Sequence, residues 1–322
     1  MNILCAVDHI TDAKIAAKML SVCSIPQDSR VYILHVLDEE LIVESERQDG
    51  KQIERKQRPE LRTRPIVFPA HIPSRAELEA QAKSLLEDAA EHLRTKIPYP
   101  VEPVFRTGVP GAEILQAIDE LNIHLVMVGA HKHTQQEIFM LSSVSDWILT
   151  EAPCPVGVLR PPAQGHDNST LKELLIAVDG SADAWAAMEF IKQLGLPSHI
   201  HLTIFHVIKQ HLPDGPLRFS TREISREDFI NTIEQTFGPR GKEAITLLEK
   251  AAATVQEGEG HIDLELAFGQ EAEEIIQRAK TIQADLLIVG SRGLTGLRRA
   301  GLMGSVSNRV ARHAPCSVLV VR

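Results

Sequence analysis

The chain has 322 residues, of which 43% are hydrophobic and 24% charged, an ordinary composition for a globular protein. This length predicts two domains, because a domain usually holds about 150 residues. The net charge of −9 and the aromatic content of 4% argue against general nucleic-acid binding, which needs basic surfaces and stacking platforms. No apolar run approaches the roughly 20 residues that span a bilayer, so we expect no membrane insertion.

The N-terminus and the cysteines both indicate a cytoplasmic location. A strand-like run, Ile3 to Val7, starts the chain with no basic region or long apolar core ahead of it, so we expect no signal peptide. The four cysteines lie far apart and form no C-x-x-C pair, which suits a reducing compartment. They are Cys5, Cys23, Cys154 and Cys316.

The predicted strands and helices alternate along the chain. In the first half we expect strands at 3–7, 32–37, 101–107, 125–128 and in PVGVL near residue 156, with long helices at 75–93 and 111–121. In the second half we expect strands at 174–178, 202–208, 262–268, 286–289 and in SVLVV at the end, with helices at 182–194, 241–255 and 271–282. Ser181 is a good N-cap for the first of these helices and Gly195 a good stop. Strands separated by helices imply right-handed crossovers and a mainly parallel sheet.

The chain repeats one unit of roughly 160 residues. ILCAVDHITDAKIAAKML near the start matches LLIAVDGSADAWAAMEFI in the middle, which aligns Asp8 with Asp179. YILHVL matches TIFHVI, LVMVGAHKH matches LLIVGSRGL, and EAPCPVGVLR matches HAPCSVLVVR. We therefore predict a first domain over 1–160, a Pro/Gly/polar linker over 161–170 and a second domain over 171–322.

Each domain is expected to be an α/β fold with an open five-stranded, mainly parallel sheet and helices on both faces. Ligands bind such sheets at the carboxyl ends of the strands, where the winding direction reverses. If strand four lies beside strand one, this crevice in the second domain lies between Asp179–Gly180 and Gly290–Ser291.

The loop after this point in the second domain reads GSRGLTGLRRAGLMGSVSNRV. Gly290 and Gly293 allow the main chain to approach a ligand closely. Gly304 and Ser305 then open a helix, whose unpaired N–H groups and dipole favour an anion. These features suit a phosphate chain. Glycines at this spacing also occur in ordinary turns, so the spacing alone supports a purely structural role as well as it supports phosphate binding.

Together these motifs make the chain resemble a tandem member of the universal stress protein family over essentially its whole length. The matching segments are AVDGS, the HV of strand two, GSRGLTGL…GSVS and HAPCSVLVVR. ATP-binding members carry G-x2-G-x9-G-(S/T). The resemblance implies strand order 3-2-1-4-5 and ATP in the crevice, with Mg²⁺ as an optional companion. By that resemblance the nucleotide-binding residues would be Asp179 and the main chain of Val207 for adenosine, Val289 and Gly290 for ribose, and Gly293, Gly304, Ser305 and Val306 for the triphosphate.

Both copies depart from the family pattern. In the second copy ten residues, rather than nine, separate Gly293 from Gly304. The first copy keeps the nine-residue spacing in GAHKHTQQEIFMLSSVS, but Lys132 replaces the second glycine and Ser142 the third. His9 and Ile10 also replace the Gly-Ser pair that follows the aspartate in the second copy. A second, degenerate nucleotide site is therefore predicted at Asp8, Val36, Gly129, Lys132, Ser142 and Ser143.

The remaining polar signals have ordinary structural interpretations. We interpret His131 and His133 as part of a polar loop and expect no metal site, because zinc needs three or four converging ligands. His35 and His206 repeat at one strand position and are expected to make local hydrogen bonds. Cys154 and Cys316 are expected to be buried structural thiols. The basic segment 51–64 is either a solvated loop or a docking surface for an anionic partner.

The leading hypothesis is a cytoplasmic stress-response protein that binds ATP in its second domain as a conformational signal. The sequence holds no G-x-x-x-x-G-K-[ST], G-x-S-x-G or H-E-x-x-H motif, so we expect no enzyme beyond slow ATP hydrolysis. We expect the domains to pack face to face as a pseudo-dimer, joined at the edges of their fifth strands. The alternatives are a weak ATPase and a ligand-independent scaffold that binds a protein or apolar partner. A protein partner and a homodimer are left open.

Overall fold

The computed structural model describes residues 1–43, 73–130, 141–161, 170–210, 217–255, 261–294 and 303–322. The elements of the first half are β1 (Asn2–Ala6), α1 (Ile10–Ser21), β2 (Arg30–Asp38), α3 (Arg75–Arg94), β3 (Val101–Gly108), α4 (Pro110–Glu120), β4 (Leu125–Gly129), α5 (Ser143–Glu151) and β5 (Val156–Leu159). Those of the second half are β6 (Glu173–Ala177), α6 (Ala182–Leu194), β7 (His201–Lys209), β8 (Leu217–Ser220), α7 (Arg226–Val255), β9 (His261–Gly269), α8 (Glu271–Thr281), β10 (Leu286–Gly290), α9 (Ser305–His313) and β11 (Ser317–Val321).

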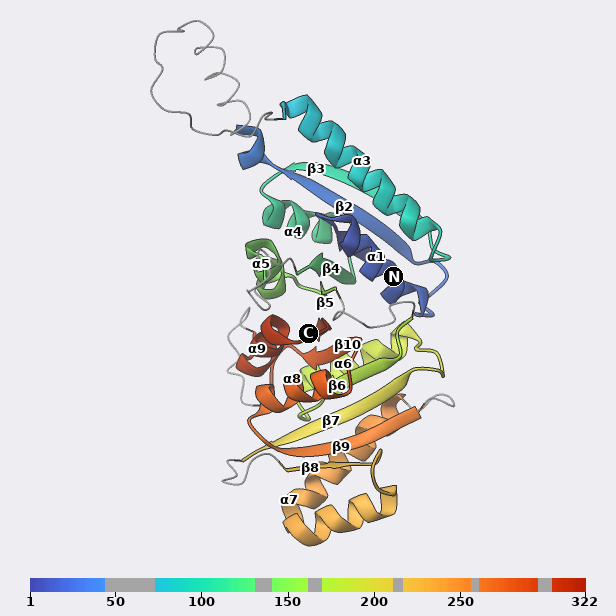
Figure 1. The fold of residues 1–322 in the computed structure, drawn as a ribbon, viewed down its shortest axis with the longest axis vertical. Helices are drawn as coiled ribbons and strands as arrows, with labels where there is room; N and C mark the ends of the chain where they lie inside the picture. The colour runs from blue at the N-terminus through green and yellow to red at the C-terminus, as the bar shows by residue number, and fades with distance from the viewer. Residues whose placement is uncertain (44–72, 131–140, 162–169, 211–216, 256–260, 295–302) are drawn as a thin grey trace, which may run out of the picture.

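The eleven strands in the described part of the chain form one sheet, in the order β3-β2-β1-β4-β5-β11-β10-β6-β7-β9-β8. With β8 left aside, the five strands of each half, numbered along the chain, stand in the order 3-2-1-4-5 and pair in parallel, as expected. The sheet runs along the length of the molecule (Figure 1). The tandem α/β organisation read from the sequence is thereby confirmed.

The two halves meet where their fifth strands pair. β5 and β11 are antiparallel, with Val158 opposite Val318 and Val156 opposite Val320. The expected edge-to-edge contact is therefore confirmed, whereas the expectation of face-to-face packing was wrong. Backbone hydrogen bonding across the edge continues the sheet, so its two faces are shared by both halves. A homodimer of this chain would need a surface other than these edges.

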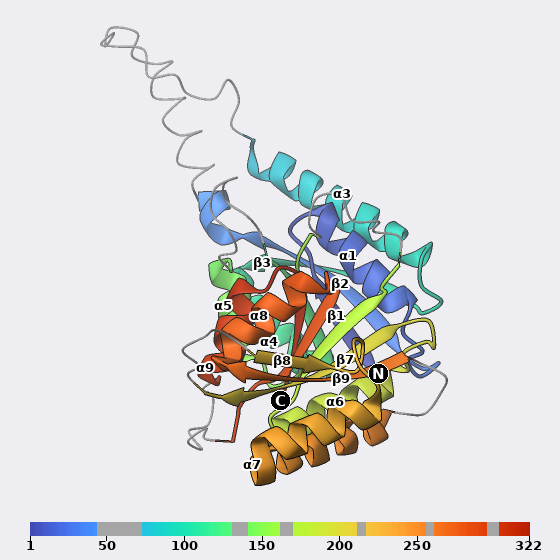
Figure 2. The same ribbon diagram turned by 60° about the horizontal axis from the view of Figure 1, so that its bottom comes forward.

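Helices cover both faces of the sheet (Figure 2). α1, α3, α6 and α7 pack on one face, and α4, α5, α8 and α9 on the other. Successive strand residues point to opposite faces, so a strand in the middle of such a sheet must be apolar throughout. In β1, Ile3 and Cys5 belong to one core while Leu4 belongs to the other.

The second half has a sixth strand that the sequence did not indicate. β8 pairs antiparallel with β9, with Phe219 opposite Leu266, and covers that edge of the sheet. Four residues are too few for an alternating pattern to stand out. The expectation of five strands was therefore wrong for this half and correct for the first.

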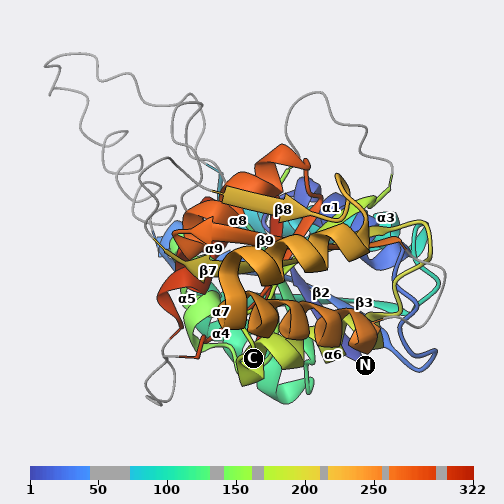
Figure 3. The same cartoon turned by 90° about the horizontal axis from the view of Figure 1, so that it is seen from below.

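α7 begins earlier than the expected helix over 241–255. Gly238 has φ 55° and ψ −133°, and Pro239 follows it. This break divides α7 into two limbs (Figure 3), of which the second is the helix that the sequence indicated. In the first limb, Phe237 stacks on Phe268 of β9 with ring centroids 4.0 Å apart.

The predicted ends of α6 are confirmed. The Ser181 hydroxyl accepts the Ala184 N–H at 3.2 Å, and Gly195 closes the helix in the left-handed region at φ 58°. The carbonyl of Gly195 also accepts the N–H of Ser24 at 3.2 Å. This helix end thereby contacts the first half.

Two arginines tie each half to a helix of the other. Arg160, next to β5, donates to the carbonyl oxygens of Ala311 in α9 and, at 3.3 Å, Cys316. Arg322, which follows β11, donates to the carbonyl oxygen of Thr150 in α5 at 3.2 Å. Cationic side chains are favourable at helix C-termini, where carbonyl groups lack helical partners. The C-terminus of each of these helices is therefore hydrogen-bonded to a side chain from the opposite half.

Candidate functional site

The strand order reverses between β1 and β4 in the first half and between β6 and β10 in the second. In the second half Ala177 of β6 lies opposite Val289 of β10, and Asp179 and Gly290 follow at the same edge. Val207 lies near the end of the neighbouring strand β7. The residues expected for adenosine and ribose therefore come from three adjacent strand ends, as a switch-point crevice requires.

Asp179 holds the start of the loop that follows β10. Its carboxylate accepts the Ser181 N–H at 2.9 Å and the Leu294 N–H at 3.2 Å. A Cβ atom on Gly293 would lie 2.9 Å from the same carboxylate, closer than real Cβ contacts come. A side chain at position 293 would therefore displace the Asp179 carboxylate, which fixes the course of the loop through its bond to Leu294.

A second carboxylate, Asp183, was not singled out from the sequence. It lies in the first turn of α6, is 7% exposed and accepts the Ser291 hydroxyl at 2.6 Å. The Asp183 carboxylate also accepts hydrogen bonds from Nε of Arg292 at 2.9 Å and from Nη2 of the same side chain at 3.2 Å. Burial raises the pKa of this carboxyl, but the hydrogen bonds from Arg292 and Ser291 outweigh it, so its pKa lies below the ordinary value. The sequence signal that could have identified Asp183 is its position, as an acidic residue in the first turn of the helix that Ser181 caps.

The N-terminus of α9 is tied to the same loop. Gly304 is the N-cap; its N–H donates to the carbonyl of Ser291 at 2.7 Å, and the Ser307 hydroxyl donates to that carbonyl at 2.6 Å. Gly304 offers no side-chain cap. Among the residues that the structure describes, no acceptor meets the N–H groups of Ser305, Val306 or Ser307. Three amide donors without described acceptors therefore lie together at the positive end of the helix dipole.

The equivalent helix of the first half, α5, is closed differently. Ser142 is its N-cap, and the Ser142 hydroxyl accepts the Ser145 N–H at 3.1 Å. Ser145 in turn donates its hydroxyl to the carbonyl of Gly129 at 2.5 Å. A Cβ atom on Gly129 would lie 2.3 Å from the carboxylate of Asp12, which also accepts the His9 N–H at 3.1 Å. One amide that is open in α9 is therefore already bonded in α5.

A cavity of about 280 Å³ lies in the crevice of the first half. It runs from the ends of β1, β2 and β4 to the first turns of α4 and α5. Of the residues expected there, Asp8, Val36, Gly129 and Ser142 line it, while Ser143 does not. Lys132 lies outside the described residues. So do His131 and His133, the segment 51–64, most of the expected linker and residues 295–302. A nucleotide in this crevice stays a prediction.

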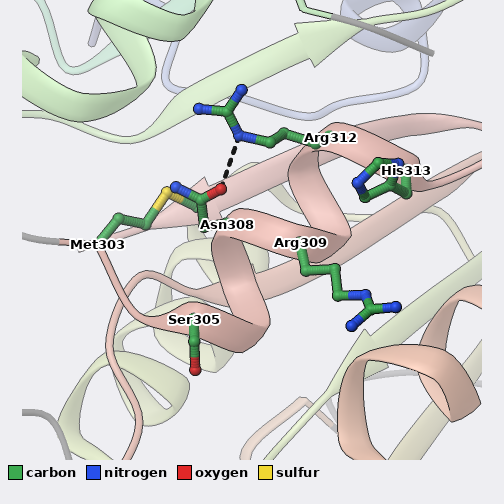
Figure 4. Close-up of a pocket in the computed structure, with 6 residues that line it drawn as sticks. All are labelled: Met303, Ser305, Asn308, Arg309, Arg312 and His313. Atoms are coloured by element: carbon green, nitrogen blue, oxygen red, sulfur yellow. Dashed lines mark hydrogen bonds between the residues drawn. The ribbon is translucent and has the colours of Figure 1, made fainter.

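A wider groove of about 540 Å³ follows the exposed side of α9 from Ser305 to its C-terminus (Figure 4). Two arginines line it, and both have acidic partners. Arg309 pairs with Glu273 of α8 at 2.8 Å, and Arg312 pairs with Asp146 of α5 across the two halves. Arg312 also donates to Asn308 at 2.7 Å. The groove therefore begins at the open amides and leads toward the junction of the halves.

The repeated histidines and cysteines have the structural roles that the sequence indicated. Nδ1 of His35 lies 2.7 Å from the carbonyl of Val7, and Nδ1 of His206 lies 2.7 Å from that of Val178. Burial lowers the pKa of His206, which keeps its ring neutral at pH 7. The equivalent cysteines are buried as well: desolvation raises the pKa to about 11 for Cys154 and about 12 for Cys316. Such thiols are unreactive at neutral pH.

Within the described ranges, no group of three or more His, Cys, Asp or Glu side chains could hold a metal ion. The same part of the chain contains no helix that is both long and apolar enough to cross a membrane.

The fold defines a tandem, doubly wound α/β protein whose strand order reverses once in each half. The family model of the universal stress proteins matches residues 1–160 and again residues 170–322. The chain therefore belongs to the universal stress protein family.

Individual relatives agree with this assignment. Universal stress protein YxiE of Bacillus subtilis is 31% identical over 150 residues, an alignment that covers 47% of this chain and 98% of the relative. The crystal structure of a universal stress protein from Archaeoglobus fulgidus matches all of this chain and 98% of its own, with a TM-score of 0.62 and 19% identity. A functionally unknown protein from Pseudomonas aeruginosa matches 99% of this chain and 92% of its own, with a TM-score of 0.58 and 17% identity. The two structures establish the tandem fold.

Proposed function

We propose that this universal stress protein binds ATP in its second domain, in the cytoplasm, and that the bound nucleotide acts as a conformational signal in a stress response. The observation that carries the proposal is the N-terminus of α9. Its three amides without described acceptors stand beside a loop held by Asp179. Phosphate is the ligand that such donors and such a dipole favour.

The other expected contacts come from the same edge of the sheet. The main chain of Val207 and the ends of β6 and β10 would hold adenosine and ribose, with Gly290 and Val289 at the wall. Gly293, Gly304, Ser305 and Val306 would surround the phosphates, and Mg²⁺ would accompany them as their counter-ion. A side chain at position 293 or 304 would crowd the loop. A Cβ atom on Gly304 would come within 3.2 Å of the Ser291 carbonyl, and one on Gly293 within 2.9 Å of the Asp179 carboxylate.

The signal would reach the first domain through α9. This helix carries the open amides at one end and is bonded to Arg160 of the first half at the other. Its Arg312 also pairs with Asp146 in α5. A change in the position of α9 on binding would therefore act on both domains, and a partner protein would recognise that change.

Calorimetric titration with MgATP of two matched variants tests the proposal. Asp179→Ala removes both hydrogen bonds that fix the loop, and we expect affinity to fall at least about tenfold, since each charge-assisted bond contributes about 1.5–3 kcal/mol. Asp8→Ala makes the same change at the equivalent position of the first half and should leave the affinity unaltered. Gly293→Val, which places a branched side chain against Asp179, should abolish binding.

Three results would contradict the proposal. Unchanged affinity in both Asp179→Ala and Gly293→Val would place the nucleotide elsewhere. Absence of any heat with the unmodified protein would favour the ligand-independent scaffold. Steady release of phosphate would replace a bound signal with a weak ATPase.

A further inference from the structure

The cavity of the first half has mainly apolar walls. Val36 from β2, Ile114 from α4, Val128 from β4 and Val144 from α5 line it from four sides. Its volume of about 280 Å³ is close to the lower end of the range of about 300–1,000 Å³ for small-molecule pockets. A dry cavity of about 150 Å³ with such walls is enough to hold benzene. The space therefore suits a molecule of one or two rings.

The charges at this cavity disfavour phosphate. Its described lining includes the carboxylates of Asp8 and Asp38 and contains no lysine or arginine. Ser142, at the start of α5, already bonds one of the amides that would otherwise face a ligand. The buried carboxylate of Asp12 lies directly behind Gly129. An anion here would meet negative charge and fewer donors than at α9.

The approach to the cavity is also apolar. Leu41 lines it and is 52% exposed, and Val109, beside the lining residue Pro110, is 51% exposed. The Trp147 ring, 43% exposed, packs on the next residue of α4, Gly111, where a Cβ atom would lie 2.2 Å from it. Leu41 is therefore an exposed apolar residue of the lining itself, and such residues are common at ligand-binding grooves.

One sequence difference between the two halves changes the inner wall of the cavity. Leu34 lines the cavity from β2, and the equivalent residue of β7 in the second half is Phe205, which is fully buried in the same core layer. The larger ring occupies more of that position in the second half. We propose that the cavity of the first domain binds a small, uncharged, apolar ring compound and not a nucleoside triphosphate.

The uncharged two-ring dye 6-propionyl-2-(dimethylamino)naphthalene, whose fluorescence changes in apolar surroundings, tests this binding with the full chain. We expect one dye per chain, and no displacement by saturating MgATP. Leu34→Phe, which copies the second half, should weaken dye binding at least about tenfold by filling the space. A matched control, Leu34→Met, conserves the volume of the side chain and should leave the dye affinity within about threefold of the unmodified protein.

Ile114→Phe fills the same cavity from the opposite wall and gives a second measurement, should Leu34→Phe fail to fold by circular dichroism. Equal dye affinity in the folded filling variants, no dye binding at all, or displacement by MgATP in proportion to its binding would each overturn the inference. Nucleotide binding by the second domain is measured separately in the same variants. Failure of one assignment can therefore be told from failure of the other.

Discussion

The first turns of α5 and α9 occupy equivalent places in the two halves, yet they present different groups to their crevices. In α5 the hydroxyl of Ser142 bonds one amide, whereas Gly304 of α9 has no side chain and leaves three amides without described acceptors. The inner wall differs too, with Leu34 in one half and Phe205 in the other. A repeated fold can thus keep its topology while single side chains change the groups that each crevice presents.

The largest effect that we expect concerns the junction that the two halves share. Arg160 is 3% exposed, and burial lowers the pKa of its guanidinium to about 10, so it remains charged at neutral pH. Arg160→Ala leaves the carbonyls at the end of α9 without their donor, and we expect it to lower the free energy of unfolding by about 3 kcal/mol. Arg322→Ala, at the less buried equivalent, should cost about half as much.

Urea denaturation of the two arginine variants measures this difference. Equal losses would mean that the junction is symmetric in energy as well as in geometry. No loss in Arg160→Ala would contradict the role of this arginine in holding α9.

The second-largest expected effect is a change in MgATP affinity that tests the difference between the two helix N-termini. Gly304→Ser introduces the hydroxyl that α5 has, which should cap the Ser307 amide and crowd the Ser291 carbonyl. We expect MgATP affinity to fall about tenfold, corresponding to about 1.4 kcal/mol. The reverse change, Ser142→Gly, should leave that affinity unaltered and change stability by only a few tenths of a kcal/mol. Calorimetric titration separates the two, and an unchanged affinity in Gly304→Ser would argue against the α9 amides as the phosphate site.

The smallest effect concerns Asp183, whose partner Ser291 is replaced by Ala130 in the first half. The pKa of this carboxyl is lower in the folded protein than in the unfolded chain, because the hydrogen bonds from Arg292 and Ser291 outweigh its burial. Asp183 therefore stabilises the fold above a pH of about 4, and this contribution is lost as the pH falls through the folded-state pKa. The half-exposed position of Arg292 limits its size.

Urea midpoints at pH 7 and pH 3 check this pH dependence. Asp183→Asn should be less stable than the unmodified protein at pH 7, and the difference in stability between the two should be smaller at pH 3. A constant difference between them at both values would show that the carboxylate charge is not involved.

Much of the fold could be predicted because its signals are local or repeated. Apolar runs such as Leu286–Val289 give the buried strands, and Ser181 with Gly195 gives the ends of α6. β8 could not be predicted, because four residues carry no period and the pairing depends on the distant edge of β9. The start of α7 was missed because Gly238 and Pro239 interrupt its helical pattern.

The site was predictable where it depends on glycine and capping residues, and not where it depends on side chains from different elements. The sequence pointed to Asp179, Gly293 and Gly304 through the motif. The bonds of Asp183 to Arg292 join residues 109 positions apart and appear only in the folded structure. The cavity beside Leu34 likewise depends on how five elements pack, which no spacing in the sequence reveals.

The most direct test of the central claim is the stoichiometry of MgATP binding to the full chain by calorimetric titration. We expect one nucleotide per chain, bound by the second domain and lost in Gly293→Val. Two nucleotides per chain, or one that persists in that variant, would contradict the distinction between the two crevices.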